Sequence, residues 1–119
     1  MNFQKICILG LGYIGLPTAS TFAGNGVRVL GVDVNPRIVD MLRSGQIHIH
    51  EPGLRDLYKS ALDTGNLTVS TRPEKADAFI IAVPTPFYDD RSGEYGSRVY
   101  KLADMRAVTS AAESIVPCL

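Results

Sequence analysis

The chain has 119 residues, 45% hydrophobic and 20% charged, which is typical of one soluble globular domain with a single modest core. Twelve basic and twelve acidic residues cancel, so the chain lacks the positive field with which proteins gather nucleic acids or anionic membranes, and we expect neither as a partner. The two cysteines, Cys7 and Cys118, are too few and too unfavourably placed for a disulfide framework or a zinc site, and we interpret them as reduced thiols in a cytoplasmic protein.

The N-terminal apolar run has a second interpretation, as a signal peptide, because Lys5 precedes it and small residues follow around 19–23. Against this, three glycines and Pro17 interrupt the run, its basic region is a single lysine, and further periodic structure follows directly. No stretch reaches the roughly 20 unbroken apolar residues of a membrane-spanning helix.

Strand and helix signals alternate along the chain. Apolar runs predict strands over 5–9, 27–32, 67–69 and 78–83, and apolar positions at helical spacing predict helices over 14–22, 36–42, 54–62 and 102–115. Asn35 is the expected N-cap of the second helix, with Pro36 at its first position. The apolar positions of the last helix are Leu102, Met105, Val108, Ala112 and Ile115. Residues 88–98 (YDDRSGEYGSR) are polar and contain glycine, which predicts a surface loop.

This alternation predicts an α/β fold with right-handed crossovers. We expect a doubly wound, Rossmann-like parallel sheet of about four strands in the order 3-2-1-4, with helices on both faces. The strand over 78–83 then lies at an edge, with backbone groups and apolar surface exposed. A homo-oligomer is therefore expected, formed through that edge or through the last helix.

The stretch ILGLGYIGLP at 8–17 contains the spacing G-x-G-x-x-G between the first strand and the first helix, which is typical of a dinucleotide-binding turn. Gly10 allows the tight turn, Gly12 lets the backbone approach a pyrophosphate, and Gly15 lets the helix pack close to the strand. Free N–H groups at the helix start, near Tyr13 and Ile14, meet the phosphate charge. The alternative is a glycine turn that binds no dinucleotide.

Asp33 ends the second strand, about 20 residues after the glycines, where a carboxylate accepts hydrogen bonds from the ribose hydroxyls. Because a carboxylate repels a 2′-phosphate, Asp33 favours NAD over NADP. Arg37 has three alternative interpretations. Its side chain lies over the adenine, it reaches a 2′-phosphate, or it is simply a solvated residue on a helix face.

Four segments together resemble the N-terminal domain of the UDP-glucose/GDP-mannose dehydrogenase family. They are GLGYIGLP at 10–17, GVDVNPRIVD at 31–40, SGQIHIHEPGL at 44–54 and IAVPTPF at 81–87. Within the family, HIHEPGL and IAVPTPF are most similar to UDP-N-acetyl-D-mannosamine dehydrogenases. Residues 89–100 are longer than the passage usual in this family.

The resemblance implies an NAD-dependent, two-step oxidation of the C6 hydroxymethyl of a nucleotide sugar to a carboxylate. It implies that Gly10, Gly12, Tyr13, Ile14 and Gly15 hold the pyrophosphate, Asp33 and Arg37 the adenosine end, and Thr85 the nicotinamide side. Thr85 also follows the strand over 78–83, at the switch point where ligands of such sheets bind; simple turn chemistry between two prolines is the alternative.

The family's catalytic cysteine, lysine and asparagine lie in later domains, and its catalytic glutamate follows the last helix. We therefore expect 1–119 to be an incomplete dinucleotide-binding domain, inactive alone, with no catalytic residue of its own and a UDP-sugar bound only with the later domains. Oxidation of another UDP-sugar, UDP-glucose or UDP-N-acetylglucosamine, is an alternative. A stand-alone dinucleotide-sensing module without catalysis is another.

The segment before the third helix contains His48, His50 and Glu51. Two histidines without a third ligand nearby suggest outward-facing imidazoles rather than a metal site, and we assign no metal. Glu51 is expected to cap the helix that follows, with a direct ligand role as the alternative.

Overall fold

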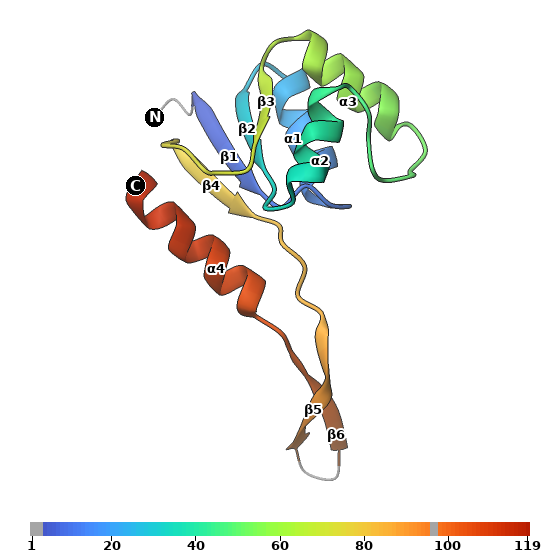
Figure 1. The fold of residues 1–119 in the computed structure, drawn as a ribbon, viewed down its shortest axis with the longest axis vertical. Coiled ribbons are helices and arrows are strands. Elements are labelled where there is room, and N and C mark those ends of the chain that lie inside the picture. Colours follow the sequence, from blue (N-terminus) through green and yellow to red (C-terminus); the bar gives the residue numbers. More distant parts are fainter. Residues whose placement is uncertain (1–3, 96–97) are drawn as a thin grey trace.

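The computed structural model describes residues 4–95 and 98–119 (Figure 1). The elements are β1 (Lys5–Leu9), α1 (Gly15–Gly24), β2 (Arg28–Val32), α2 (Pro36–Arg43), α3 (Leu54–Asp63), β3 (Leu67–Ser70), β4 (Ala78–Ile81), β5 (Phe87–Tyr95), β6 (Arg98–Ala103), α4 (Arg106–Ile115) and the short 3-10 turn η1 (Val116–Cys118). Strands β1 to β4 form a parallel sheet in the order β3-β2-β1-β4, which confirms the predicted fold class and strand order.

The carboxyl ends of the central strands lie level with one another. Leu9 of β1 pairs with Val32 of β2 on one side and with Ile81 of β4 on the other. The turns that leave these three strands are therefore neighbours at one edge of the sheet. That edge is where ligands of open α/β sheets bind.

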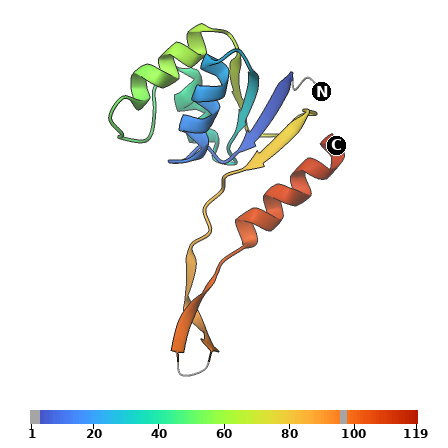
Figure 2. The ribbon, with the colours of Figure 1, turned by 180° about the vertical axis from the view of Figure 1, so that it is seen from behind.

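The side chains of β1 point alternately to the two faces of the sheet, and each face has its own layer of core. Ile6 and Ile8 face the layer that contains α1, α2 and α3, and Cys7 and Leu9 face the layer that contains α4. Figures 1 and 2 show α4 on the opposite face of the sheet from the other helices. The prediction of helices on both faces is confirmed, although residues 71–77, which lead from β3 to β4, contain no helix.

Tyr58 connects two helices inside the larger layer. Its side chain is fully buried, and its hydroxyl donates a hydrogen bond of 2.6 Å to the carbonyl of Leu42 at the end of α2. Burial raises the pKa of Tyr58 to about 12, because the phenolate loses its hydration there. The aromatic ring thus fills the core while its polar end is satisfied.

The two helix caps predicted from sequence have different outcomes. Asn35 caps α2 as predicted: its side chain accepts a hydrogen bond of 3.0 Å from the N–H of Arg37. The predicted role of Glu51 is wrong. The N-cap of α3 is Gly53, at φ +79°, and Glu51 contributes its backbone carbonyl, which accepts from the N–H of Leu54. Because Gly53 is in the left-handed conformation, the chain turns so that the backbone carbonyl of Glu51, and not its carboxylate, meets the start of α3.

The expected surface loop over 88–98 is instead largely an antiparallel ribbon of β5 and β6, with a register irregularity between Phe87 and Ser92. Residues 96–97, part of the expected loop, lie outside the described residues. The sequence of these two strands lacks the unbroken apolar run by which core strands are recognised.

The ribbon also shortens the last helix. Leu102 lies in β6 and Met105 is the N-cap of α4, although both fit helical spacing with Val108. Ala111 is buried against the sheet, whereas the predicted Ala112 is exposed. The helix therefore begins later than predicted, and Ala111 takes the place predicted for Ala112, while Ile115 packs against the sheet as predicted.

None of the helices within 4–95 and 98–119 combines the length and apolar character needed to cross a membrane.

Candidate cofactor-binding site

The first glycine of the motif turns the chain between two strand ends. Gly10 has φ +97°, and a Cβ built on it would lie 2.6 Å from the carbonyl oxygen of Ala82. Its N–H donates a hydrogen bond of 2.7 Å to the carbonyl of Val32. No other residue fits this turn without moving the backbone after β4.

The other two glycines have opposite surroundings. A Cβ on Gly15 would lie 1.6 Å from the carbonyl oxygen of Gly10, so the start of α1 packs directly on the turn. A Cβ on Gly12 would meet no atom of the described residues within 4 Å. Gly10 and Gly15 are therefore required by the fold, whereas Gly12 lies against open space.

The start of α1 offers hydrogen-bond donors to that space. Its N-cap is Ile14, with no side-chain cap and no acidic residue in the first turn. Within the described residues, the backbone N–H groups of Gly12, Tyr13 and Ile14 donate to no protein acceptor. The side chains of Tyr13 and Ile14 are 64% and 71% exposed. The positive end of the helix dipole adds to these donors, and together they favour an anion.

Asp33 joins the glycine turn to the turn after β2. Its Oδ2 accepts a hydrogen bond of 3.1 Å from the N–H of Leu11, and its Oδ1 accepts one of 3.0 Å from the N–H of Asn35. The side chain is half-buried, so each oxygen keeps a further lone pair for another donor. The bond to Leu11 was missed from sequence, because G-x-G-x-x-G with a later acid gives the spacing of these groups but no contact between them.

Arg37 lies in the first turn of α2, beyond Asp33, and is exposed. Among the described residues its guanidinium pairs with no carboxylate. Val34, which directly follows Asp33, is 89% exposed. A free cation and an exposed apolar side chain thus flank Asp33.

Thr85 follows β4 at the same edge of the sheet and is exposed between two exposed prolines. The backbone just before it, at Ala82, closes over Gly10. The structure therefore brings the three predicted segments to one edge of the sheet, with direct contacts between the glycine turn and both Asp33 and Ala82. Arg37 and Thr85 share that edge, and among the described residues no hydrogen bond joins either of them to the turn.

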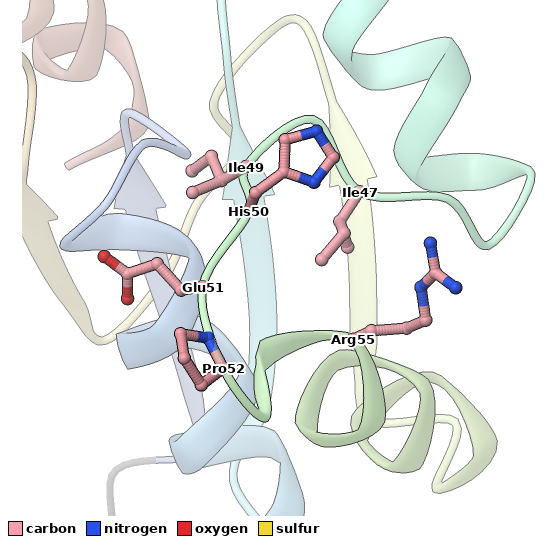
Figure 3. Close-up of a pocket in the computed structure, with 6 residues that line it drawn as sticks. All are labelled: Ile47, Ile49, His50, Glu51, Pro52 and Arg55. Atoms are coloured by element: carbon pink, nitrogen blue, oxygen red, sulfur yellow. The ribbon is translucent and has the colours of Figure 1, made fainter.

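A pocket of about 370 Å³ lies elsewhere, over the loop before α3. Ile47, Ile49, His50, Glu51, Pro52 and Arg55 line it (Figure 3). Figure 3 shows Glu51 and Arg55 extending in opposite directions, so their charges do not converge on one ligand.

The two histidines of this loop differ, and the expectation of two outward imidazoles is wrong for one of them. His50 is exposed, whereas His48 is half-buried and its Nδ1 is buried without a partner among the described residues. The same described part of the chain contains no group of three His, Cys, Asp or Glu residues that could hold a metal ion.

The cysteines are both free. Cys7 is fully buried in β1, and loss of hydration there raises the pKa of its thiol. A buried thiol with a raised pKa is a poor nucleophile.

Comparison with known proteins agrees with the geometry of this edge. The model of the NAD binding domain of the UDP-glucose/GDP-mannose dehydrogenase family matches residues 4–119. A UDP-N-acetyl-D-mannosamine dehydrogenase of Methanococcus maripaludis is 48% identical over 118 residues, which is 99% of this chain and 26% of that protein. One of Campylobacter jejuni is 57% identical over 89 residues, 75% of this chain and 22% of that protein.

Solved structures give the same result. The UDP-N-acetyl-mannosamine dehydrogenase Cap5O from Staphylococcus aureus superimposes with a TM-score of 0.86 at 50% identity, covering 97% of this chain and 26% of that chain. A GDP-mannose dehydrogenase from Pseudomonas aeruginosa gives a TM-score of 0.78 at 30% identity, covering 92% and 24%. The chain thus spans about a quarter of the length of these relatives. It belongs to the UDP-glucose/GDP-mannose dehydrogenase family, of which it forms an NAD-binding domain.

Proposed function

We propose that this chain binds NAD for a UDP-N-acetyl-D-mannosamine 6-dehydrogenase, an enzyme that oxidises the sugar C6 hydroxymethyl to a carboxylate. The choice of sugar is supported by the relatives named for that substrate, at 48% and 57% identity. The observation that carries the cofactor site is the open space at Gly12 beside backbone N–H groups that donate to no acceptor in 4–95 and 98–119. A pyrophosphate fits such a site because it needs close backbone approach and N–H groups at a helix start.

Each predicted residue has a role in this proposal. Gly12, Tyr13 and Ile14 hold the pyrophosphate through backbone N–H groups, on a turn whose shape depends on Gly10 and Gly15. Asp33 accepts from the adenosine ribose with the lone pairs left free by Leu11 and Asn35. Arg37 covers the adenosine end, and Thr85 lies on the nicotinamide side, beyond β4.

Bound NAD supplies the hydride acceptor. What this chain contributes is orientation, because Asp33 and the glycine turn fix one another before the cofactor arrives. The groups that react with the sugar would come from parts of the relatives beyond the quarter matched here, so residues 1–119 alone are expected to bind NAD without turnover. The two free cysteines and the use of NAD support a cytoplasmic location.

The substrate proposal is tested with the protein in its full natural length. NADH formation is followed with UDP-N-acetylmannosamine, UDP-N-acetylglucosamine and UDP-glucose in turn. We expect the highest kcat/KM with UDP-N-acetylmannosamine. A higher value with either of the other two sugars would overturn the assignment while leaving NAD binding intact.

We further propose that the chain forms a homo-oligomer through the edge of β4 or through α4. The two edges of the sheet differ. At the β3 edge, Nε and Nη2 of Arg43 donate hydrogen bonds of 3.1 and 2.9 Å to the carbonyl of Val69, so the guanidinium covers that edge. No such cover is found at β4 in the described part of the chain, and its residues are only half-buried. Sedimentation at high micromolar concentration tests this, and a monomer would contradict it.

A further inference from the structure

Helix α4 is buried less deeply than α1, a helix of the same length. Of the ten described residues of α4, Ala111 alone is buried, whereas five of the ten residues of α1 are buried. α4 packs chiefly on β4 and on the turn η1 that follows it, and α1 packs on α3 and on three strands. Elements with few buried apolar contacts are those that open locally while the rest of a protein stays folded.

The small layer of core under α4 also holds the chain at the end of β4. Its buried members are Cys7, Leu9, Leu30, Val32 and Ala111. Ile115 of α4 packs against these residues, and so do Ile81 and Val83. The helix and the chain that leaves β4 are therefore supported by the same layer.

The segment 81–85 lies between this layer and the glycine turn. Ile81 and Val83 pack on the layer shared with α4. The backbone of Ala82, between them, closes over the turn, since a Cβ built on Gly10 would lie 2.6 Å from its carbonyl oxygen. One side of the segment thus rests on the core under α4, and the other side shapes the proposed cofactor edge.

The chain beyond Val83 has little freedom to bend. Pro84 and Pro86 flank Thr85, the residue proposed to lie on the nicotinamide side. Each proline fixes its own φ near −65° and restricts the residue before it. A displacement of Val83 is therefore passed on to Thr85 rather than absorbed between them.

We propose that the docking of α4 on β4 and the binding of NAD are thermodynamically linked. Docked α4 completes the layer against which Ile81 and Val83 pack, and so holds 81–85 where the cofactor needs it. Because linkage is reciprocal, bound NAD favours docked α4 by the same factor. The inference rests on the NAD site proposed above, and it gives a positioning role to a helix on the opposite face of the sheet from α1 (Figures 1 and 2).

Hydrogen exchange of the wild-type chain, with and without saturating NAD, tests the linkage. Without NAD, the amides of α4 are expected to exchange faster than those of α1 and α3, because α4 opens while the larger layer stays folded. Saturating NAD is expected to slow the exchange of α4 by at least about fivefold, the lower end of coupling between sites. An unchanged rate for α4, while titration shows that NAD is bound, would overturn the linkage and leave the cofactor site intact.

A matched pair of substitutions tests the linkage from the side of the helix. Ala111→Glu places a carboxylate at the buried position and is expected to release α4, because an unpaired charge is too costly to bury. Ala112→Glu adds the same residue at the exposed neighbouring position and is the control. The affinity for NAD is expected to fall by at least about fivefold in Ala111→Glu and to stay within about twofold of the wild type in Ala112→Glu.

Ile115→Ala keeps the test valid if Ala111→Glu loses its whole fold by circular dichroism. This variant removes part of a half-buried side chain without adding charge, and it is expected to speed the exchange of α4 and to weaken NAD binding by a smaller factor. Wild-type affinity in a folded variant whose α4 exchanges faster would overturn the linkage. A folded wild type that binds no NAD would instead overturn the proposed function, and the linkage with it.

Discussion

At the scale of single residues, Gly12 and Gly15 have different functions although they belong to one motif. A Cβ on Gly15 would overlap the carbonyl of Gly10 at 1.6 Å, whereas one on Gly12 would meet nothing within 4 Å in the part of the chain that the structure describes. Gly15 is therefore required for folding, and Gly12 is required for binding of the proposed ligand. The motif therefore combines two physical constraints that its spacing alone does not separate.

Substituting alanine at each position tests this division. Gly15→Ala is expected to lower the free energy of unfolding by about 3 kcal/mol, because backbone must move to admit the methyl group. Gly12→Ala is expected to leave it within about 0.5 kcal/mol and to weaken NAD binding by at least about tenfold, because the methyl group occupies the space of the pyrophosphate. Urea unfolding and calorimetric titration measure the two effects. Equal loss of stability in both variants would contradict the distinction.

Asp33 also serves the fold and the ligand together. Its carboxylate holds the N–H groups of Leu11 and Asn35 while keeping lone pairs for a ribose. In Asp33→Asn one of the two acceptor oxygens becomes a donor, so one hydrogen bond is lost and the negative charge is removed.

We expect Asp33→Asn to lower the free energy of unfolding by about 2 kcal/mol, the range for hydrogen bonds to charged groups. We also expect the preference for NAD over NADP to narrow, since a neutral amide does not repel a 2′-phosphate. Denaturation and parallel titrations with both cofactors check this. An unchanged NAD/NADP ratio would show that Asp33 acts on the turn alone.

At the scale of elements, the hydroxyl of Tyr58 connects α3 to the end of α2. Its pKa is about 12 in the folded protein and about 10 when unfolded, so the unfolded chain loses the proton first as the pH rises. The contribution of the neutral hydroxyl is fully present below about pH 10 and is lost between about pH 10 and pH 12.

The wild type should therefore lose on the order of 2–3 kcal/mol more stability than Tyr58→Phe over that interval, at 1.36 kcal/mol per pH unit. At neutral pH the variant is expected to be less stable by about 1–2 kcal/mol, because the carbonyl of Leu42 loses its partner. Chemical denaturation between pH 7 and pH 12 measures both quantities. NAD affinity should be unchanged, and parallel pH profiles of the two proteins would refute the account.

The elements also show what sequence could and could not predict. The parallel strands and the glycine turn were predictable, because buried runs and a turn with one allowed conformation leave a local signature. The ribbon was not, since the sequence of β5 and β6 contains no unbroken apolar run of the kind that core strands show. Met105 was predicted to lie within the last helix because it keeps helical spacing, but it is the N-cap of α4. The bond from Leu11 to Asp33 depends on how two turns meet, which spacing does not encode.

At the scale of the whole molecule, the sheet, the glycine turn and the ribbon share one end. The carboxyl ends of β1, β2 and β4 carry the proposed cofactor residues, and the ribbon leaves from the same edge. The family assignment gives the domain its cofactor.

The central claim is that the edge formed by the glycine turn and Asp33 binds NAD, and it is tested most directly by calorimetric titration of the 119-residue chain with NAD and, separately, with NADP. The account predicts saturable binding of NAD and at least about tenfold weaker binding of NADP, because Asp33 accepts from a 2′-hydroxyl and repels a 2′-phosphate. Equal affinity for both cofactors would contradict the role of Asp33. Binding of neither by a chain that is folded by circular dichroism would contradict the site.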